Sequence, residues 1–277
     1  MLRQLYYKVS PESRFFLRKI WYFPIDFLEG ISGKREKGVP KKGDIFIGSG
    51  DFVAQGEEQL SLLKKHINLQ PDDKVLDIGC GIGRTAYALT KYFSSEGSYN
   101  GFDTVKKGIV WCNRNITSRF KNFEFKHVPL RNNLYNTSNG NAATFQFPYD
   151  DQTFTKIFLF SVFTHMKLDE IQNYLSEIQR TMTEDGKCLA TFFIYSKEDK
   201  LENFPGFTFP VKRDGYRLLD ENVEEANIAL DIEVLEKMAK KAGLHIEKTE
   251  RGFWRDLNKE GGKKYFQDII VFTKITK

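Results

Sequence analysis

An acid and three glycines follow an apolar run in the stretch Val75-Leu76-Asp77-Ile78-Gly79-Cys80-Gly81-Ile82-Gly83-Arg84. Glycine adopts left-handed backbone conformations at little cost, so glycines at alternate positions favour a sharp turn that a ligand can approach closely. We expect a buried strand over residues 74–78, this turn, and a helix over residues 83–93 whose first N–H groups face the ligand. A carboxylate before the turn repels a pyrophosphate and attracts an ammonium group, so Asp77 indicates a ligand with a cationic amino-acid end.

This stretch resembles the first motif of the class I S-adenosylmethionine-dependent methyltransferases, a hydrophobic strand followed by Asp/Glu-x-Gly-x-Gly-x-Gly. The dinucleotide-binding fingerprint Gly-x-Gly-x-x-Gly instead requires a glycine where this chain has Arg84, which disfavours an NAD(P)-dependent oxidoreductase. The resemblance implies that S-adenosyl-L-methionine is the cofactor and that residues of the turn bind it. These candidates are Asp77, Gly79, Cys80, Gly81, Gly83 and Arg84.

A second acid, Asp103, lies 20 residues after Gly83 at the end of the strand predicted over residues 98–103. A carboxylate there can accept hydrogen bonds from both hydroxyls of a ribose, and the resemblance implies this role. The alternative is that Asp103 serves only as the N-cap of the next helix. Thr104 follows directly, and we expect it to flank the adenine.

The fourth predicted strand, residues 156–160, is followed by further candidates at the edge where open α/β sheets bind their ligands. We expect Ser161 and Phe163 to lie against the methionine part of the cofactor or its sulfonium. His165 has a side chain that titrates near neutrality, which makes it the candidate general base. A structural role for His165 at the start of the next helix is the alternative.

Strands and helices alternate from Lys74 onward, which predicts right-handed parallel crossovers and a doubly wound sheet with helices on both faces. The resemblance covers roughly residues 45–275 and implies seven mostly parallel strands, the seventh inserted antiparallel beside the fifth. In addition to the strands given above, we expect strands over 123–128, 188–194, 244–250 and 267–274, helices over 57–69, 106–119, 168–182 and 232–242, and a turn at 184–186.

The net charge of +5 is concentrated near the N-terminus. Residues 1–43 contain ten Lys and Arg and four Asp and Glu, whereas the rest of the chain contains 32 and 33. The nearly balanced charge of the residues after the first 43 argues against a nucleic-acid enzyme whose basic groove surrounds its active site. Three widely spaced cysteines form neither a zinc motif nor a disulfide framework, so we expect a reduced, cytoplasmic protein without a metal site.

We divide the chain into a basic, aromatic N-terminal extension, residues 1–43, and a methyltransferase domain, residues 44–277, with an acceptor or lid insertion at about 195–230. Pro24 is expected to interrupt any helix in the extension. The extension packs on the domain, pairs with a second subunit or contacts an anionic membrane. Phe52 precedes the first motif, and we expect it either beside the sulfonium as a cation–π partner or packed on the sheet.

Together these features predict methyl transfer from S-adenosylmethionine to a small-molecule acceptor, at oxygen or nitrogen. A rival of another class is a non-catalytic cofactor-binding or membrane-recruited interaction protein on a methyltransferase fold. The intact glycine motif and Asp103 weigh against that rival, and the basic, aromatic N-terminus favours it.

Overall fold

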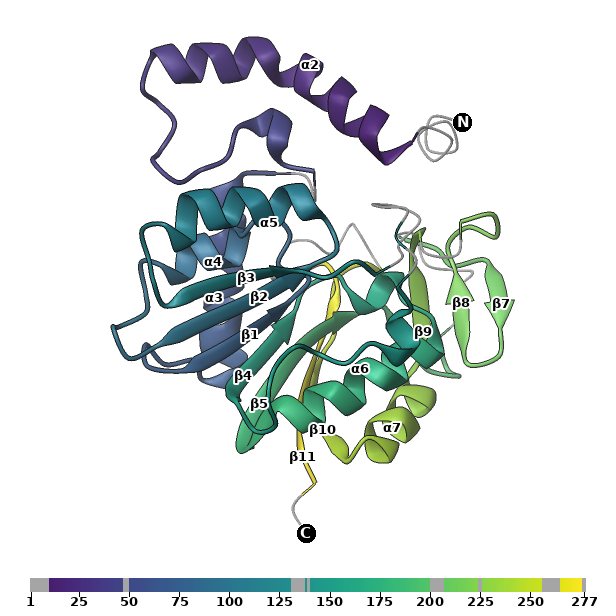
Figure 1. The fold of residues 1–277 in the computed structure, drawn as a ribbon. Coiled ribbons are helices and arrows are strands. Elements are labelled where there is room, and N and C mark those ends of the chain that lie inside the picture. Colours follow the sequence, from purple (N-terminus) through teal and green to yellow (C-terminus); the bar gives the residue numbers. More distant parts are fainter. Residues whose placement is uncertain are drawn as a thin grey trace.

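Seven strands form the central sheet of the computed structural model, which describes residues 10–46, 50–130, 138, 140–199, 207–223, 226–255 and 265–275 (Figure 1). The strands are β1 (Lys74–Ile78), β2 (Ser98–Asp103), β3 (Phe123–His127), β4 (Phe154–Leu159), β5 (Met182–Phe192), β10 (Leu244–Glu250) and β11 (Asp268–Lys274). Their order is β10-β11-β5-β4-β1-β2-β3. Strand β11 runs antiparallel to both β10 and β5, and the other pairs are parallel. The predicted seven-stranded, mostly parallel sheet is confirmed.

Helices cover both faces of this sheet. Neighbouring residues of a strand point to opposite sides, so each strand packs against both helix layers. Val75 packs in one buried cluster with Leu63 and Leu89, whereas Leu76 packs in the other with Leu175 and Leu235. Figure 1 shows the corresponding two layers. The first consists of α3 (Phe52–Ile67), α4 (Arg84–Leu89) and α5 (Lys106–Cys112) with its continuation η2 (Asn113–Thr117), and the second of α6 (Leu168–Thr181) and α7 (Ile232–Lys241).

Two local predictions are wrong. Residues 184–186, expected as a turn, lie within β5, whose pairing with β4 jumps from Phe154–Met182 to Lys156–Lys187. The extra residues are absorbed as a bulge in the ladder and do not end the strand. The helix expected from residue 57 begins five residues earlier at Phe52, because the Asp51 side chain caps it by accepting the Ala54 N–H at 2.8 Å.

The segment after β5 forms a small second sheet of β6 (Ile194–Tyr195), β7 (Val211–Arg213), β8 (Tyr216–Leu218) and β9 (Ile228–Asp231), in the order β6-β9-β8-β7. Phe209 of this segment is buried against Phe193 and Trp254. Phe204 and Pro205, which belong to the predicted acceptor or lid insertion, lie outside the described part of the chain. The remaining ends of the elements agree with the predicted ranges to within a few residues.

The N-terminal extension contains a long helix, α2 (Pro11–Ile31), and Pro24 lies inside it. The prediction that Pro24 interrupts a helix here is therefore wrong. One proline removes a single helical hydrogen bond, and the contacts of α2 with η1 (Lys42–Asp44) offset that loss. Asp26 accepts the N–H groups of Lys42 and Gly43 at 2.7 and 2.9 Å. Among the described residues, no helix is both long enough and apolar enough to span a bilayer.

Candidate functional site

A cavity of about 500 Å³ opens at the carboxyl ends of β1 and β4. The glycine turn forms one wall, and the segment after β4 forms another. The sequence predicted seven of the residues that line it: Asp77, Gly79, Cys80, Gly81, Arg84, Ser161 and His165. Ile82, between the second and third glycines, also lines it. The structure thus brings two separate predicted motifs to one hollow, as expected where parallel strands end together.

Asp77 is the buried acid of this cavity, with 3% of its surface exposed. It is the fourth residue of β1, so burial of the strand carries the carboxyl out of water. Tyr99 on the neighbouring strand β2 donates its hydroxyl to Asp77 Oδ2 at 2.7 Å. Burial raises the pKa of Asp77 to about 7; the Tyr99 hydrogen bond lowers it and the nearby Asp103 raises it further. A cation in the cavity would favour the ionised carboxylate.

The turn depends on left-handed backbone at its three glycines, with φ values of +76° for Gly79, +60° for Gly81 and +75° for Gly83. Side chains other than hydrogen are strained there. A Cβ on Gly79 would lie 2.5 Å from Val162 Cγ2, so the segment after β4 also packs directly on the turn. The N–H groups of Gly79 and Cys80 both donate to the Phe102 carbonyl, at 2.9 and 3.1 Å.

Asp103 lies at the end of β2 and supports the same turn from behind. Its Oδ2 accepts the Gly81 N–H at 2.8 Å, and its Oδ1 accepts the Val105 N–H at 2.7 Å. Burial raises its pKa, and these backbone hydrogen bonds lower it. The N-cap of α5 is Val105, so the alternative that Asp103 is that N-cap is wrong. Thr104 is half-buried, and its carbonyl oxygen lies 3.3 Å from His127 Nε2.

Three residues after β4 take different positions. Ser161 adopts a left-handed φ of +58° and donates its hydroxyl to Gln267 Oε1 at 2.9 Å. His165 lies in η4 (Phe163–His165) and lines the cavity half-buried. Phe163 is fully buried, and its ring stacks on Phe192 with centroids 4.9 Å apart. Phe163 is therefore not among the described residues that line the cavity.

Phe52 is also absent from the described residues that line this cavity. Its side chain is 3% exposed and packs in a separate cluster with Ile45 and Ile82, with its ring 5.9 Å from that of Tyr87. Phe52 therefore packs in the protein interior, but in a cluster that contains no residue of the sheet, so the predicted packing on the sheet is wrong. Because Phe52 is the first residue of α3, its contacts fix the start of that helix.

Sequence reasoning missed the opposite wall of the cavity. The first turns of α3 contribute three polar residues, and residues between β10 and β11 contribute an aromatic group. The polar residues are spaced i, i+3 and i+4, a signal that could have identified one helix face. The aromatic residues carry no local motif. These lining residues are Gln55, Glu58, Gln59, Phe253, Tyr265, Phe266 and Gln267, with Thr85, Phe160 and Asn227.

A hydrogen bond links this wall to α4, the helix that follows the glycine turn. Thr85 at the start of α4 donates its hydroxyl to Gln59 Oε1 at 2.7 Å. Burial raises the pKa of Glu58, so the carboxyl of this residue is less readily ionised than a carboxyl in water. Burial likewise raises the pKa of Tyr265, which keeps its hydroxyl protonated at neutral pH.

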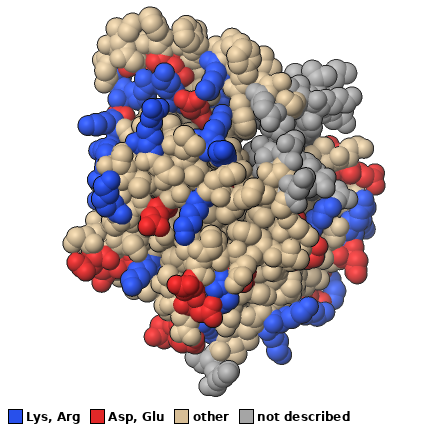
Figure 2. All heavy atoms as spheres, in the orientation of Figure 1, with Lys and Arg blue, Asp and Glu red and all other residues tan. Residues whose placement is uncertain are grey.

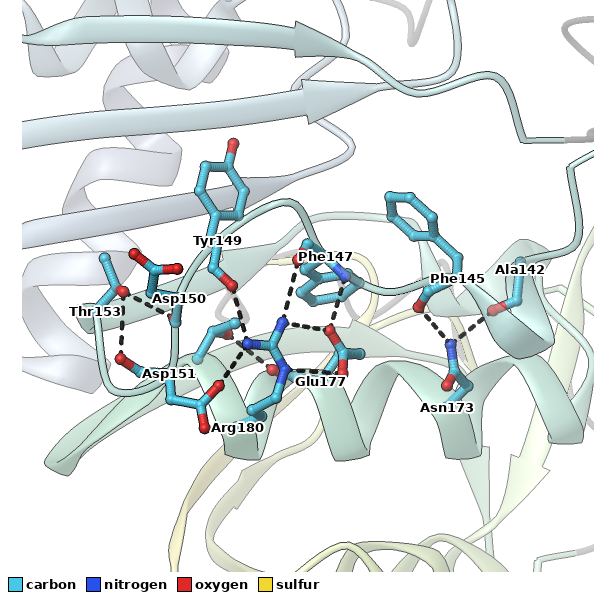
Figure 3. A network of polar contacts seen from close by, with 11 residues as sticks. Ala142, Phe145, Phe147, Tyr149, Asp150, Asp151, Thr153, Asn173, Glu177 and Arg180 are labelled. Atoms are coloured by element: carbon cyan, nitrogen blue, oxygen red, sulfur yellow. Dashed lines mark hydrogen bonds and ion pairs between the residues drawn. The ribbon is translucent and has the colours of Figure 1, made fainter.

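A polar network holds the segment before β4 against α6 (Figure 3). Arg180 donates to Glu177 Oε2 and Asp151 Oδ1, both at 2.7 Å, and to the Tyr149 carbonyl at 2.9 Å. Asn173, two turns earlier on α6, donates to the Ala142 and Phe145 carbonyls. These bonds satisfy the backbone of an irregular segment and thereby fix the entry to β4.

A sheet of this order, with an acid and a glycine turn at the carboxyl end of its central strand, defines a class I S-adenosylmethionine-dependent methyltransferase. The family described as "Methyltransferase domain" matches residues 69–243, and the chain belongs to that family. The resemblance seen in the first motif is confirmed.

Individual relatives match part of the chain. Demethylmenaquinone methyltransferase of Alkalihalophilus pseudofirmus is 29% identical over 129 residues, 46% of this chain and 48% of that protein. "Putative methyltransferase YrhH" of Bacillus subtilis is 30% identical over 121 residues, 44% of this chain and 58% of that protein. The matches thus span about half the length of these relatives. The crystal structure of the PH0226 protein from Pyrococcus horikoshii OT3 has a TM-score of 0.55 at 18% identity, covering 84% of this chain and 95% of that one, and supports the fold.

Proposed function

We propose that the chain transfers the methyl group of S-adenosylmethionine to a small-molecule acceptor bound in the same cavity. The observation that carries the proposal is the buried Asp77 carboxyl, which lines a 500 Å³ cavity beside three left-handed glycines. A small-molecule site of this volume is of the usual size. The residues fit the cofactor, because a buried acid suits an ammonium group and a glycine turn admits close approach of a ligand.

The predicted residues other than Phe52 and Phe163 receive roles in this proposal. Asp77 holds the ammonium of the methionine part, and the backbone of Gly79, Gly81 and Gly83 faces the cofactor. Asp103 accepts the ribose hydroxyls with lone pairs that remain on its two oxygens, since each accepts one backbone N–H. Cys80, Arg84, Thr104 and Ser161 complete the surroundings.

When bound, the cofactor supplies a methyl group on a positively charged sulfur, which is already an activated electrophile. The protein then positions the acceptor in line with that bond and excludes water. His165 lines the cavity and takes the proton of an oxygen acceptor in this proposal. The aromatic wall formed by Phe160, Tyr265 and Phe266 suits an acceptor with an apolar part.

Calorimetry with S-adenosylmethionine and with its demethylated product tests the cofactor assignment. We expect dissociation constants in the micromolar range, typical of substrates of enzymes, and no binding of NADH. Tight NADH binding without heat from either adenosyl ligand would overturn the proposal. Cofactor binding without turnover across broad acceptor classes would favour the non-catalytic rival.

A glycine pair gives a matched test of the turn. Gly81→Val should abolish cofactor binding, because a branched side chain is strained at φ +60° and stands at the cavity wall. Gly33→Val is the control, since Gly33 has φ +65° and open space around its Cβ position, far from the cavity in the sequence. Equal affinity in both variants would show that the turn does not hold the cofactor.

A further inference from the structure

Helix α2 presents an apolar face to solvent. Its most exposed side chains are Trp21, at 77%, and Ile31, at 72%. Six further apolar residues recur at helical spacing and are between 56% and 65% exposed: Phe16, Leu17, Ile20, Phe23, Phe27 and Leu28. Residues at this spacing share one side of a helix. A contiguous exposed apolar surface of this size indicates contact with another protein molecule or with a membrane.

The polar side of α2 faces inward and fixes the helix on the protein. Asp26 is 9% exposed and bonds the backbone of Lys42 and Gly43. Glu29 pairs with Lys42 Nζ at 2.7 Å. Between residues 13 and 31 these are the two acids, so this part of the outer face carries no negative charge. Both acids point away from the apolar face.

Cations border the apolar face. On a helix, Arg14 and Arg18 lie beyond one edge of the apolar sector and Lys19 beyond the other. The segment that follows α2 adds further cations that are exposed and form no ion pair with any described residue: Lys34, Lys37 and Lys41. Figure 2 shows blue side chains gathered below the tan ridge that α2 forms.

We propose that the outer face of α2 docks this protein on an anionic lipid bilayer, with the helix lying in the plane of the interface. Apolar side chains enter the boundary of the acyl region while the bordering Lys and Arg side chains reach the headgroups. Trp21, the most exposed aromatic residue of the described part of the chain, suits that boundary. The cations argue against a second copy as the occupant, because a symmetric pair would bring the same positive charges together.

Sedimentation of the full chain with vesicles tests this docking. The probes are phosphatidylcholine vesicles with and without roughly 30% phosphatidylglycerol, enough for a strong negative surface potential. The chain should sediment with the anionic vesicles and remain in solution with the neutral ones, and high salt should release it. The double variant Trp21→Glu/Phe27→Glu should lower the partition coefficient roughly tenfold or more. Val110→Glu on α5 is the matched control, since Val110 is also 57% exposed, and it should bind as the wild type does.

A second measurement places Trp21 at the lipid. Anionic vesicles should shift the tryptophan fluorescence of the wild type to shorter wavelength, and Trp21→Phe should abolish the shift while retaining binding. Failure of the wild type to bind anionic vesicles, or equal binding by the double Glu variant, would overturn the proposal. Sedimentation equilibrium showing a dimer that the double variant dissociates, with no vesicle binding, would identify a second copy as the occupant instead. Cofactor calorimetry on each variant checks the fold independently of membrane binding.

Discussion

Acidification should weaken binding of the cofactor through protonation of Asp77. The carboxyl titrates near pH 7 in the free protein, because burial disfavours its charge. If the ammonium of the cofactor binds the carboxylate, only the ionised fraction of the protein is competent to bind. That fraction is about one half at pH 7 and about one eleventh at pH 6, so the apparent dissociation constant should rise about fivefold over that interval.

The direction of this pH dependence follows from the raised pKa of Asp77. A cation that binds the carboxylate lowers the pKa of Asp77 in the complex, so binding near neutral pH releases a proton. At pH 6.5 the release should approach about three quarters of a proton per cofactor bound, which is the protonated fraction for a pKa of about 7. Affinity should therefore increase from pH 5.5 to pH 7 and level off above that.

Calorimetry in buffers of different ionisation enthalpy measures both the affinity and the number of protons released. Asp77→Asn removes the titrating group and keeps the shape of the side chain, so its affinity should be weaker at pH 8 and nearly independent of pH. His165→Ala is the second control, because His165 also lines the cavity. A wild-type affinity that stays flat from pH 5.5 to pH 7, without proton release, would refute the assignment of Asp77 to the ammonium.

Three further substitutions test other parts of the structure. Asp103→Ala should weaken cofactor binding by about 1–3 kcal/mol, the scale of hydrogen bonds to a charged group; unchanged affinity by calorimetry in a folded variant would mean that the ribose is held elsewhere. His165→Ala should retain cofactor affinity and, if His165 is the base, lower the turnover number ~10²–10⁴-fold once an acceptor is known; equal turnover would assign it a structural role. Asp268→Asn should lower the free energy of unfolding by about 3 kcal/mol, because the fully buried carboxylate pairs with Arg255 and accepts the Trp254 indole N–H. Urea unfolding measures that loss, with the exposed Asp185→Asn as control, and equal midpoints in the two variants would contradict it.

The sequence was sufficient to predict the sheet and one wall of the cavity, because both depend on local patterns. Val75 and Leu76 place apolar side chains on opposite sides of β1, as a strand covered by two helix layers requires. The turn after it needs glycine at fixed positions, and those positions are visible in any single chain. The antiparallel last strand came from the resemblance to the family, since no property of residues 267–274 specifies their direction.

The other wall could not be predicted, because it is assembled by tertiary packing. Tyr265 and Gln267 reach the cavity only because β11 inserts beside β5, more than 70 residues earlier in the chain. Phe52 and Phe163 were expected at the cofactor because aromatic residues near a motif are plausible partners of a cation. Both are instead needed to fill the core, and a sequence does not show which aromatic side chain a neighbouring element will cover.

The two acids of the site are of the same residue type, but their hydrogen-bond partners indicate different roles. Asp77 and Asp103 end neighbouring parallel strands, and both are almost fully buried. Each oxygen of Asp103 already accepts a backbone N–H, which stabilises the charged form and fixes the turn. Asp77 accepts a hydrogen bond from the Tyr99 hydroxyl, and its pKa remains near 7. Asp77 is therefore the carboxyl that gains most from an added cation, because none of the described residues forms an ion pair with it.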